Sequence, residues 1–358
     1  WTAARYIAGE FAAMGFEPVD EDGDFIDEYP IRIPELDPTQ TRMILEAGGE
    51  KLELLCGKDF AISPSLESPE LTGVALAPVV EYEWYRANPG SIPEGSLVLT
   101  YGPLMGMAEI TEGLRFGSWM ENVLEAGAEA VGMILPAQLP SEMMPVLAEQ
   151  VAASPRLEGP PMLLFPVSTV QRIFEFAGAE VPEMDPIETI QYARLAVSLE
   201  MQVTTRTITA PNVLARLPGA RSEDLDGVVL TAHFDHEPPG QPNAEGDSIY
   251  NGADDNASGT VGLMEAARAF AALPEPPLRS VVFAAVSAEE MGLLGSTYLA
   301  EHGPAPASST AANLNMDMLS RNGSDSIFVF GQTYSSLGKV FREVLEGHPE
   351  LEFQVRSG

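Results

Sequence analysis

Short apolar runs without polar alternation recur in the second half of the chain and predict buried strands. Three of them are VVL at 228–230, VVFAAV at 281–286 and ANLNM at 312–316. Runs of this length, apolar on both faces, are typical of parallel strands that helices cover on both sides. The pattern therefore predicts an α/β fold.

Helical periodicity appears at the start of the chain and between the strand candidates. Residues 2–15 place Ala3, Tyr6, Ile7, Phe11 and Met14 on one face, and Gly15 follows as a stop signal. TVGLMEAARAFAAL at 260–273 and SSLGKVFREVLEG at 335–347 are further helix candidates. The alternation of strands and helices supports the same fold class.

A hairpin is predicted near the start of the chain, and a second domain after it. MILEA and KLELL flank Gly48 and Gly49, a glycine pair that suits a tight turn between two strands. From about residue 61 the chain becomes rich in Pro and Ser, and strand-like segments follow up to about residue 187. We therefore expect three segments, with boundaries at 1–60, 61–187 and 188–358, in which the middle one is an inserted domain.

Polar residues follow each predicted strand of the second half. They are His233, Asp235, Asp254, Asp255, Glu289, Glu290 and Asp317. Parallel strands end at one edge of a sheet, which is where ligands bind in open α/β folds. Carboxylates and imidazole are the ligands of zinc and similar divalent metals. These clusters predict a metal site at that edge.

Each cluster also has a structural interpretation when it is taken alone. His233 and Asp235 could belong to a solvated loop, and the acidic pairs at 254–255 and 289–290 could favour the N-termini of helices. Asp317 could form a salt bridge, although basic partners are scarce. The metal-site interpretation depends on all of the clusters meeting in one place.

Taken together, the motifs resemble the zinc aminopeptidases of peptidase family M28. The matching stretches are His-x-Asp-His, Ser-Ile-Tyr-Asn-Gly-Ala-Asp-Asp-Asn-Ala-Ser-Gly, Ala-Glu-Glu-x-Gly-Leu-Leu-Gly-Ser and Asn-x-Asp-Met, in that order. The resemblance implies a mixed, mostly parallel sheet flanked by helices, the zinc exopeptidase or phosphorylase/hydrolase-like fold. The segment 1–60 and the segment 188–358 would form the metallopeptidase domain, and 61–187 resembles the smaller α/β protease-associated (PA) domain that is inserted in members of this family.

The same resemblance implies a set of metal ligands and two Zn²⁺ ions. His233 and Asp317 would bind one zinc, Glu290 would bind the other, and Asp254 would bridge the two. The family has a fifth ligand, a late histidine. We expect it after Gly358, with the chain shortened at that end, and assign neither His302 nor His348 to it.

The resemblance also implies the catalytic groups. Glu289 would be the general base that takes a proton from the attacking water, and Asp235 would hold His233. The expected activity is removal of N-terminal residues from peptides. The open alternatives are a non-catalytic receptor or scaffold of the same fold, a single-zinc acyltransferase of the glutaminyl cyclase type, and a carboxypeptidase that selects an acidic C-terminus.

Charge and composition restrict the partners. The formal net charge of −34 argues against binding to nucleic acid or to an anionic membrane surface. No apolar run approaches the roughly 20 residues of a membrane span. Cys56 is the only cysteine, so no internal disulfide forms. A peptide substrate is the expected partner, an exported location is expected only from the family resemblance, and the oligomeric state stays open.

Overall fold

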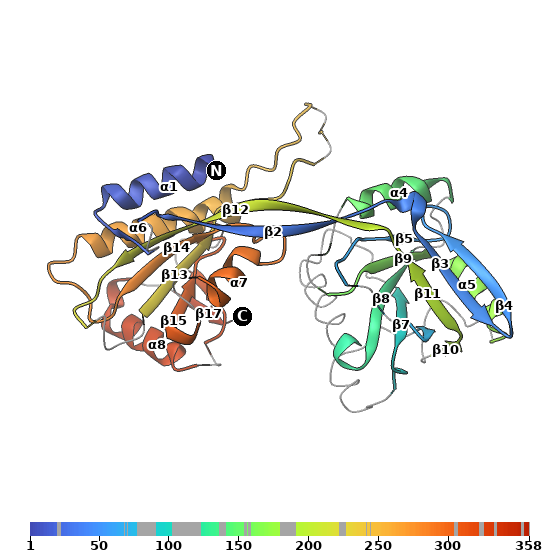
Figure 1. Cartoon of the computed structure of the whole chain (residues 1–358). Helices are drawn as coiled ribbons and strands as arrows, with labels where there is room; N and C mark the ends of the chain where they lie inside the picture. Colours follow the sequence, from blue (N-terminus) through green and yellow to red (C-terminus); the bar gives the residue numbers. More distant parts are fainter. Residues whose placement is uncertain are drawn as a thin grey trace. The chain divides into compact units, whose positions relative to one another are not determined.

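The computed structural model divides the chain into two compact units, which are described separately. Unit 1 comprises Trp1–Ile31 and Ile208–Gly358, and unit 2 comprises Arg32–Thr207. The structure describes residues 1–19, 23–67, 69, 71–76, 91–101, 123–135, 141–153, 156, 159–179, 191–221, 227–240, 242–243, 245–303, 307–321, 326–332, 335–351 and 354–357. Figure 1 shows the elements of both units.

Unit 1 is built on a mixed sheet. Its strands are β1 (Glu17–Pro18), β2 (Ile26–Leu36), β12 (Val203–Leu217), β13 (Gly227–His233), β14 (Val281–Val286) and β15 (Thr310–Asn315). The order is β1-β12-β14-β13-β15, and β2 also pairs with β12. β13 runs parallel to β14 and to β15, whereas β12 is antiparallel to β1 and β14. The sheet is thus mixed, as predicted, but its parallel part is the β14-β13-β15 group alone.

Helices cover both faces of this sheet. α1 (Thr2–Ala13) and α6 (Gly259–Ala271) pack on one face, and α7 (Leu294–Glu301) packs on the other. β14 shows why its run is wholly apolar: Val281, Phe283 and Ala285 join the core under α1 and α6, while the residues between them face α7. Alternating side chains therefore enter two separate cores, as the continuous apolar pattern predicts.

The remaining elements of unit 1 follow the sheet in the chain. They are η3 (Ala253–Ser258), η4 (Ala307–Ser309), β16 (Ser326–Val329), α8 (Leu337–Gly347), η5 (Pro349–Leu351) and β17 (Gln354–Ser357). β16 and β17 form a separate parallel pair. The helix predicted at 335–347 is confirmed by α8.

The prediction that 312–316 is buried is wrong. β15 is mostly exposed, and the Leu314 side chain has 47% of its surface accessible. β15 pairs only with β13 and forms the edge of the described sheet, so half of its backbone and one face lack a neighbour there. An apolar run alone does not tell an edge strand from a central one.

Unit 2 contains a six-stranded sheet in the order β10-β6-β7-β8-β9-β5. The strands are β5 (Ala61–Ile62), β6 (Gly73–Leu76), β7 (Ser96–Tyr101), β8 (Ala128–Leu135), β9 (Met162–Pro166) and β10 (Gln191–Arg194). The four strands from β6 to β9 are parallel, and the two edge strands are antiparallel to them. η2 (Ser141–Met143), α4 (Met144–Ala152) and α5 (Val167–Phe176) accompany this sheet.

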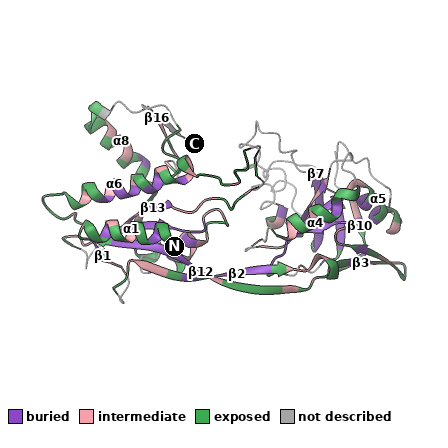
Figure 2. Cartoon of the chain, turned by 90° about the horizontal axis from the view of Figure 1, so that it is seen from above, coloured by how far each residue is buried: buried purple, intermediate pink, exposed green. Residues whose placement is uncertain are grey.

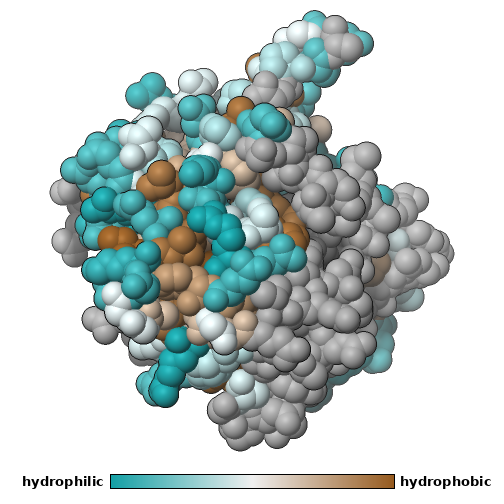
Figure 3. Space-filling view, turned by 90° about the vertical axis from the view of Figure 1, so that its right-hand side faces the viewer, coloured by the Kyte–Doolittle hydropathy of each residue, from teal (hydrophilic) through white to brown (hydrophobic). Residues whose placement is uncertain are grey.

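A smaller antiparallel sheet completes unit 2. η1 (Pro38–Gln40) leads into β3 (Arg42–Ala47), which pairs with β4 (Glu50–Leu55) and with β11 (Ala196–Glu200). The predicted hairpin is confirmed, because Gly48 and Gly49 join β3 to β4 with φ angles of +60° and +88° that suit glycine. Charged residues form ion pairs on the outer face, and Figure 3 shows hydrophilic residues (teal) beside apolar ones (brown) on that side of the molecule.

The division into units differs from the predicted domain boundaries. The predicted insertion runs over 61–187, whereas unit 2 begins at Arg32 and ends at Thr207. The reason is packing: Met43, Leu45 and Leu54 of the small sheet belong to the same core cluster as Leu97 and Leu163 of the large one. Figure 2 shows the buried residues (purple) concentrated in the strands of each unit.

Candidate metal centre

The three parallel strands of unit 1 place polar side chains at one edge of the sheet. His233 is the last residue of β13, Glu289 follows the end of β14 by three residues, and Asp317 follows β15 by two. β13 lies between β14 and β15, and all three run in the same direction. Their carboxyl ends therefore meet, which is the arrangement that the strand pattern predicts.

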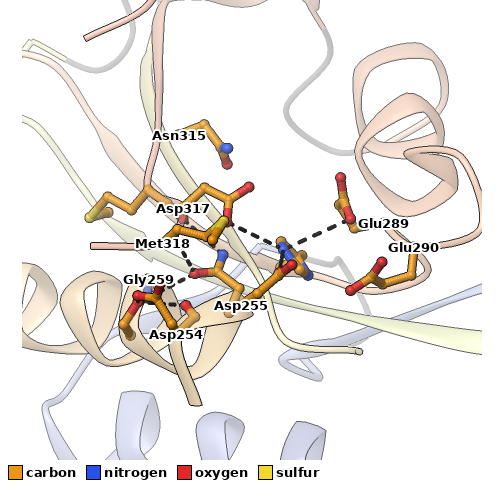
Figure 4. A network of polar contacts seen from close by, with 12 residues as sticks. Asp254, Asp255, Gly259, Glu289, Glu290, Asn315, Asp317 and Met318 are labelled. Carbon is orange, nitrogen blue, oxygen red and sulfur yellow. Dashed lines mark hydrogen bonds and ion pairs between the residues drawn. The ribbon is translucent and has the colours of Figure 1, made fainter. Parts of the chain in front are cut away.

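The first group of potential metal ligands is centred on His233. His233, Glu289 and Asp317 each offer a ligand atom, and these atoms lie within 4.8 Å of one another. The His233 Nε2 atom is 3.6 Å from Asp317 Oδ1 and 3.8 Å from Glu289 Oε2. Figure 4 shows Asp317 and Glu289 approaching from opposite sides of this centre.

The other ring nitrogen of His233 is held by the backbone. Nδ1 lies 3.1 Å from the carbonyl oxygen of Asp235. A carbonyl oxygen can only accept, so Nδ1 carries a proton, and in the neutral imidazole Nε2 offers its lone pair to a cation. The Thr260 hydroxyl donates to the His233 carbonyl at 2.7 Å and fixes the backbone at the end of β13.

Asp235 contacts both His233 and the loop that carries the acidic pair. Its carboxylate is 3.7 Å from His233 Nδ1, while its two oxygens accept the backbone N–H groups of Glu289 at 3.2 Å and Glu290 at 3.4 Å. Asp235 thus holds His233 through its carbonyl oxygen and holds the acidic pair through its carboxylate. The end of β13 and the loop after β14 are thereby fixed to each other.

The second group consists of His236, Asp255 and Glu290, again with ligand atoms within 4.8 Å of one another. His236 Nδ1 lies 2.8 Å from Glu290 Oε1. The same Asp255 reaches the first group, because its Oδ1 is 3.1 Å from His233 Nε2. Asp255 is therefore shared between the two groups, and Figure 4 shows it between Asp254 and Glu290.

The resemblance implies Asp254 as the bridging acid, whereas the structure places Asp255, the other member of the acidic pair, between the two groups. Asp254 Oδ1 accepts hydrogen bonds from the Ser320 backbone N–H and hydroxyl, and Asp254 belongs to neither group of potential ligands. Asp255, whose backbone departs from helical geometry with φ −103° and ψ 96°, faces the centre instead. Neighbouring side chains diverge, and only the local backbone decides which of the two turns inward.

His236 was also missed as a candidate, although its signal was present. It is the last residue of the His-x-Asp-His motif, and two residues of spacing from the strand end allow it to reach Glu290. His302 and His348 are exposed and pair with Glu301 and Glu350, respectively. Among the described residues, neither belongs to a group of potential ligands.

Electrostatics show that the centre favours positive charge. Burial of His233 opposes its protonation, but the Asp235 carboxylate near Nδ1 and the charges of Glu289 and Asp317 outweigh burial and raise its pKa to about 9. The pKa of Glu289 is also raised, first by burial and then by the neighbouring acids, against the opposing effect of His233. Without a metal ion, a proton on His233 is the positive charge that these acids stabilise.

One atom tests directly whether these residues suit a metal. Nε2 of His233 is buried and has no hydrogen-bond partner, although carboxylate oxygens of three acids face it within 4 Å. A buried nitrogen without a partner is costly, and a cation between it and the oxygens would satisfy all of them. One imidazole and several carboxylates per group form a donor set that zinc accepts.

A buried polar network supports the loop that carries Glu289 and Glu290. The Asn212 side chain accepts the Ser287 N–H at 3.0 Å and donates to the Gly295 carbonyl at 2.9 Å, so it holds both ends of the loop. The Tyr29 hydroxyl donates to the Ser287 carbonyl at 3.0 Å. Burial raises the pKa of Tyr29 to about 12, so this hydroxyl remains a donor.

Comparison with known proteins gives matches over this part of the chain. Residues 212–352 match the model of "Peptidase family M28". A probable zinc metalloprotease of Pyrenophora tritici-repentis is 40% identical over 119 residues, which are 33% of this chain and 23% of that protein. Aminopeptidase YwaD of Bacillus subtilis is 31% identical over 112 residues, 31% of this chain and 22% of that protein.

Among solved structures, a zinc aminopeptidase from Bacillus subtilis is similar with a TM-score of 0.42 and 18% identity, covering 100% of this chain and 73% of that one. The sequence matches span less than a quarter of each of the two curated relatives. The segment that carries both groups of potential metal ligands is the one that matches peptidase family M28.

Proposed function

We propose that this chain is a zinc-dependent aminopeptidase with two zinc sites. His233 and Asp317 would hold one ion, Glu290 and His236 the other, and Asp255 would lie between them. The distances within the two groups and the sharing of Asp255 support this assignment. The match to peptidase family M28 and the similarity to an aminopeptidase of Bacillus subtilis support the reaction class.

The buried, unpaired Nε2 of His233 is the observation that carries the proposal. Carboxylate oxygens of Asp255, Glu289 and Asp317 face this nitrogen at 3.1 to 3.8 Å, and these contacts are favourable only where a positive charge lies among them. A metal ion would supply that charge and would bind the nitrogen and the three carboxylates at once. The structural interpretations of the separate clusters do not explain this atom.

The residues around the centre fit the hydrolysis of a peptide bond. When bound, two zinc ions lower the pKa of a water molecule towards about 7 and polarise the carbonyl oxygen of the substrate. Glu289 belongs to the first group of potential ligands, and its side chain is 30% exposed. Its carboxylate can take a proton from the attacking water and give it to the leaving amine.

Zinc content and hydrolysis test the proposal together. We expect the purified protein to bind about two equivalents of zinc, measured by elemental analysis, and to release N-terminal residues from a panel of aminoacyl amides. A strong chelator should abolish this hydrolysis and added zinc should restore it. Absence of zinc binding would contradict the proposal and leave the receptor or scaffold alternative.

The zinc count also separates the second enzymatic alternative. A single equivalent, with cyclisation of N-terminal glutamine and no release of amino acids, would favour the glutaminyl cyclase type. Two complete groups of potential ligands support the dinuclear proposal over that one. A carboxypeptidase is least supported, because Arg321 lies near Asp254 rather than within either group.

We further propose that unit 2 corresponds to the protease-associated domain and controls access of the substrate. Its parallel β6-to-β9 group with α4 and α5 supports an α/β domain, and the described residues of unit 2 contribute no member to either group of potential ligands. A role in access rather than chemistry follows from this distribution.

A further inference from the structure

The segment that carries Asp317 has no regular structure of its own. β15 ends at Asn315, and residues 316–320 continue as an irregular stretch over the start of α6. Asp317 contributes one of the three atoms of the first group, yet its side chain is 40% exposed. Some other part of the chain must therefore set its position.

The segment η3 supplies that support through alternate residues. Asp254 Oδ1 accepts the Ser320 N–H at 3.0 Å and the Ser320 hydroxyl at 2.5 Å. The Ser258 hydroxyl oxygen accepts the Leu319 N–H at 2.9 Å. The last residues of the irregular stretch are thus tied to the first turn of α6 and the segment before it.

Asn256 bonds the stretch on the other side of Asp317. Its Oδ1 accepts the Met318 N–H at 3.2 Å, and its Nδ2 donates to the Met316 carbonyl at 3.0 Å. The residues immediately before and after Asp317 are therefore both bonded to one buried amide. Figure 4 shows Asp254 and Gly259 below Asp317 and Met318.

The close approach of the two segments depends on Gly259. A Cβ atom at this position would lie 2.3 Å from the Met316 carbonyl oxygen and 2.3 Å from Asn256 Oδ1, so any larger residue would push the segments apart. Gly259 N–H also donates to Asn256 Oδ1 at 2.9 Å. The sequence Asp-Asp-Asn-Ala-Ser-Gly thus has two structural roles. Asp255 faces the metal centre, and its neighbours in this segment hold residues 316–320.

We propose that Asp254 is a positioning residue, which fixes Asp317 at the first zinc site by holding Ser320. This inference rests on the proposed function, because it assigns Asp254 to the support of a site whose metal is itself proposed. Asp254 reaches Ser320, three residues after Asp317, and shares the task with Asn256 and Ser258. This role differs from the bridging contact that the family resemblance implies for Asp254.

The test compares zinc affinity in three variants, measured by competition with a chromophoric chelator. Asp254→Ala removes the oxygen that accepts both hydrogen bonds from Ser320, and we expect one of the two zinc equivalents to bind about 10- to 100-fold more weakly, the scale for loss of a residue that orients a ligand. Asp254→Asn keeps a carbonyl oxygen for Ser320 and should recover most of the affinity. Ser320→Ala keeps the backbone N–H bond and should give an intermediate loss.

Two controls separate positioning from other effects. Asp37 makes the same contacts in unit 2, accepting the Thr39 N–H at 2.9 Å and the Thr39 hydroxyl at 2.6 Å, so Asp37→Ala should leave both zinc affinities unchanged. The visible absorption of the cobalt-substituted protein reports ligand geometry, and we expect it to change in Asp254→Ala and to return in Asp254→Asn. A purely structural role would not produce that return.

Two results would overturn the inference, and a third would contradict the proposed function. Equal losses in Asp254→Asn and Asp254→Ala would indicate a direct ligand, because an amide replaces a bridging carboxylate poorly. Wild-type zinc affinities and an unchanged cobalt spectrum in Asp254→Ala would show that the contact between Asp254 and Ser320 has no influence on the zinc site. If Asp254→Ala does not fold, wild-type affinities and an unchanged spectrum in Ser320→Ala would show the same. Wild-type protein that binds no zinc would instead contradict the proposed function.

Discussion

Glu289 is the residue whose environment best distinguishes catalysis from metal binding. It lies with His233 and Asp317, yet the backbone N–H bond to Asp235 fixes only its main chain and leaves its carboxylate free to move a proton. Burial raises its pKa, which makes it a better proton acceptor than an ordinary surface glutamate. Its function as a base therefore depends on a charge that glutamine lacks.

We expect Glu289→Gln to retain zinc and to lose about 100-fold or more in turnover, the scale of general-base loss. The measurement is kcat for an aminoacyl amide, together with zinc content. Glu265→Gln, an exposed glutamate on α6 that pairs with Arg268, is the matched control and should keep full turnover. Near-normal turnover of Glu289→Gln would refute the assignment of the base.

His236 is the imidazole of the second group of potential ligands among the described residues. We expect His236→Ala to weaken one zinc equivalent by at least about tenfold, because the His236–Glu290 pair loses its imidazole. The control is His348→Ala, which removes an exposed imidazole that also bonds a glutamate at 2.9 Å. Unchanged binding of both equivalents in His236→Ala would exclude it as a ligand.

The acidic pair at 254–255 shows where residue-level prediction ends. The sequence alone makes both acids candidates, and the resemblance suggests the first. The structure turns Asp255 to His233 and Asp254 to Ser320, because the backbone at Asp255 leaves helical geometry. Which acid faces the cation is a property of one pair of φ and ψ angles, and no spacing rule contains it.

At the scale of elements, strand ends and the loops after them are held by buried amides. Asn212 lies on β12 and is fully buried, with both its side-chain atoms bonded to the loop between β14 and α7. Its removal would leave the Ser287 N–H and the Gly295 carbonyl without partners. The loop that carries Glu289 and Glu290 would lose its anchor at both ends.

We expect Asn212→Ala to lower the free energy of unfolding by about 1–3 kcal/mol for each group left unsatisfied. The measurement is the midpoint of urea-induced unfolding of the zinc-loaded protein. Asn243→Ala is the control, because Asn243 Oδ1 also accepts two backbone N–H groups but lies in an exposed loop. A shift for Asn212→Ala no larger than that of Asn243→Ala would contradict a structural role for the network.

Strand pattern predicted the central elements well and the edge poorly. β13 and β14 are buried between helices, as their apolar runs indicate, and the hairpin β3–β4 turns at the predicted glycines. β15 has a similar apolar run but is exposed in the described part of the sheet. Burial depends on neighbours in space, which a local run of residues cannot specify.

For the whole molecule, the two units have separate cores. Leu97, Phe165 and Ile173 lie in a core cluster made wholly of unit 2 residues, while the cluster under α1 and α6 is made of unit 1 residues. Both groups of potential ligands lie in unit 1. The potential metal ligands therefore lie in unit 1, while unit 2 has a hydrophobic core of its own.

We therefore expect a fragment of residues 32–207 to unfold cooperatively and to bind no zinc, because its core is complete within the fragment. Circular dichroism during thermal unfolding and elemental analysis would measure the two properties. A fragment of residues 61–187, which follows the boundaries expected from sequence, is the comparison and should be less stable, since it lacks β3, β4, β10 and β11. Equal stability of both fragments would favour the sequence boundaries.

Location and membrane contact are separate questions at this scale. None of the described helices is long and apolar enough to cross a bilayer. The exported location expected from the family resemblance stays a prediction, and fractionation of the source cells followed by detection of the protein would test it.

The sequence by itself determined the fold class, the strand and helix candidates, and the clusters that supply imidazole and carboxylates to one edge of a parallel sheet. These features are local or follow from strand direction, so periodicity and motif order are sufficient to find them. Only the tertiary structure decided that Asp255 faces His233, that His236 meets Glu290, and that segments 32–60 and 191–207 belong to unit 2 and contribute to its core. Those outcomes depend on backbone angles and on contacts between residues far apart in the chain.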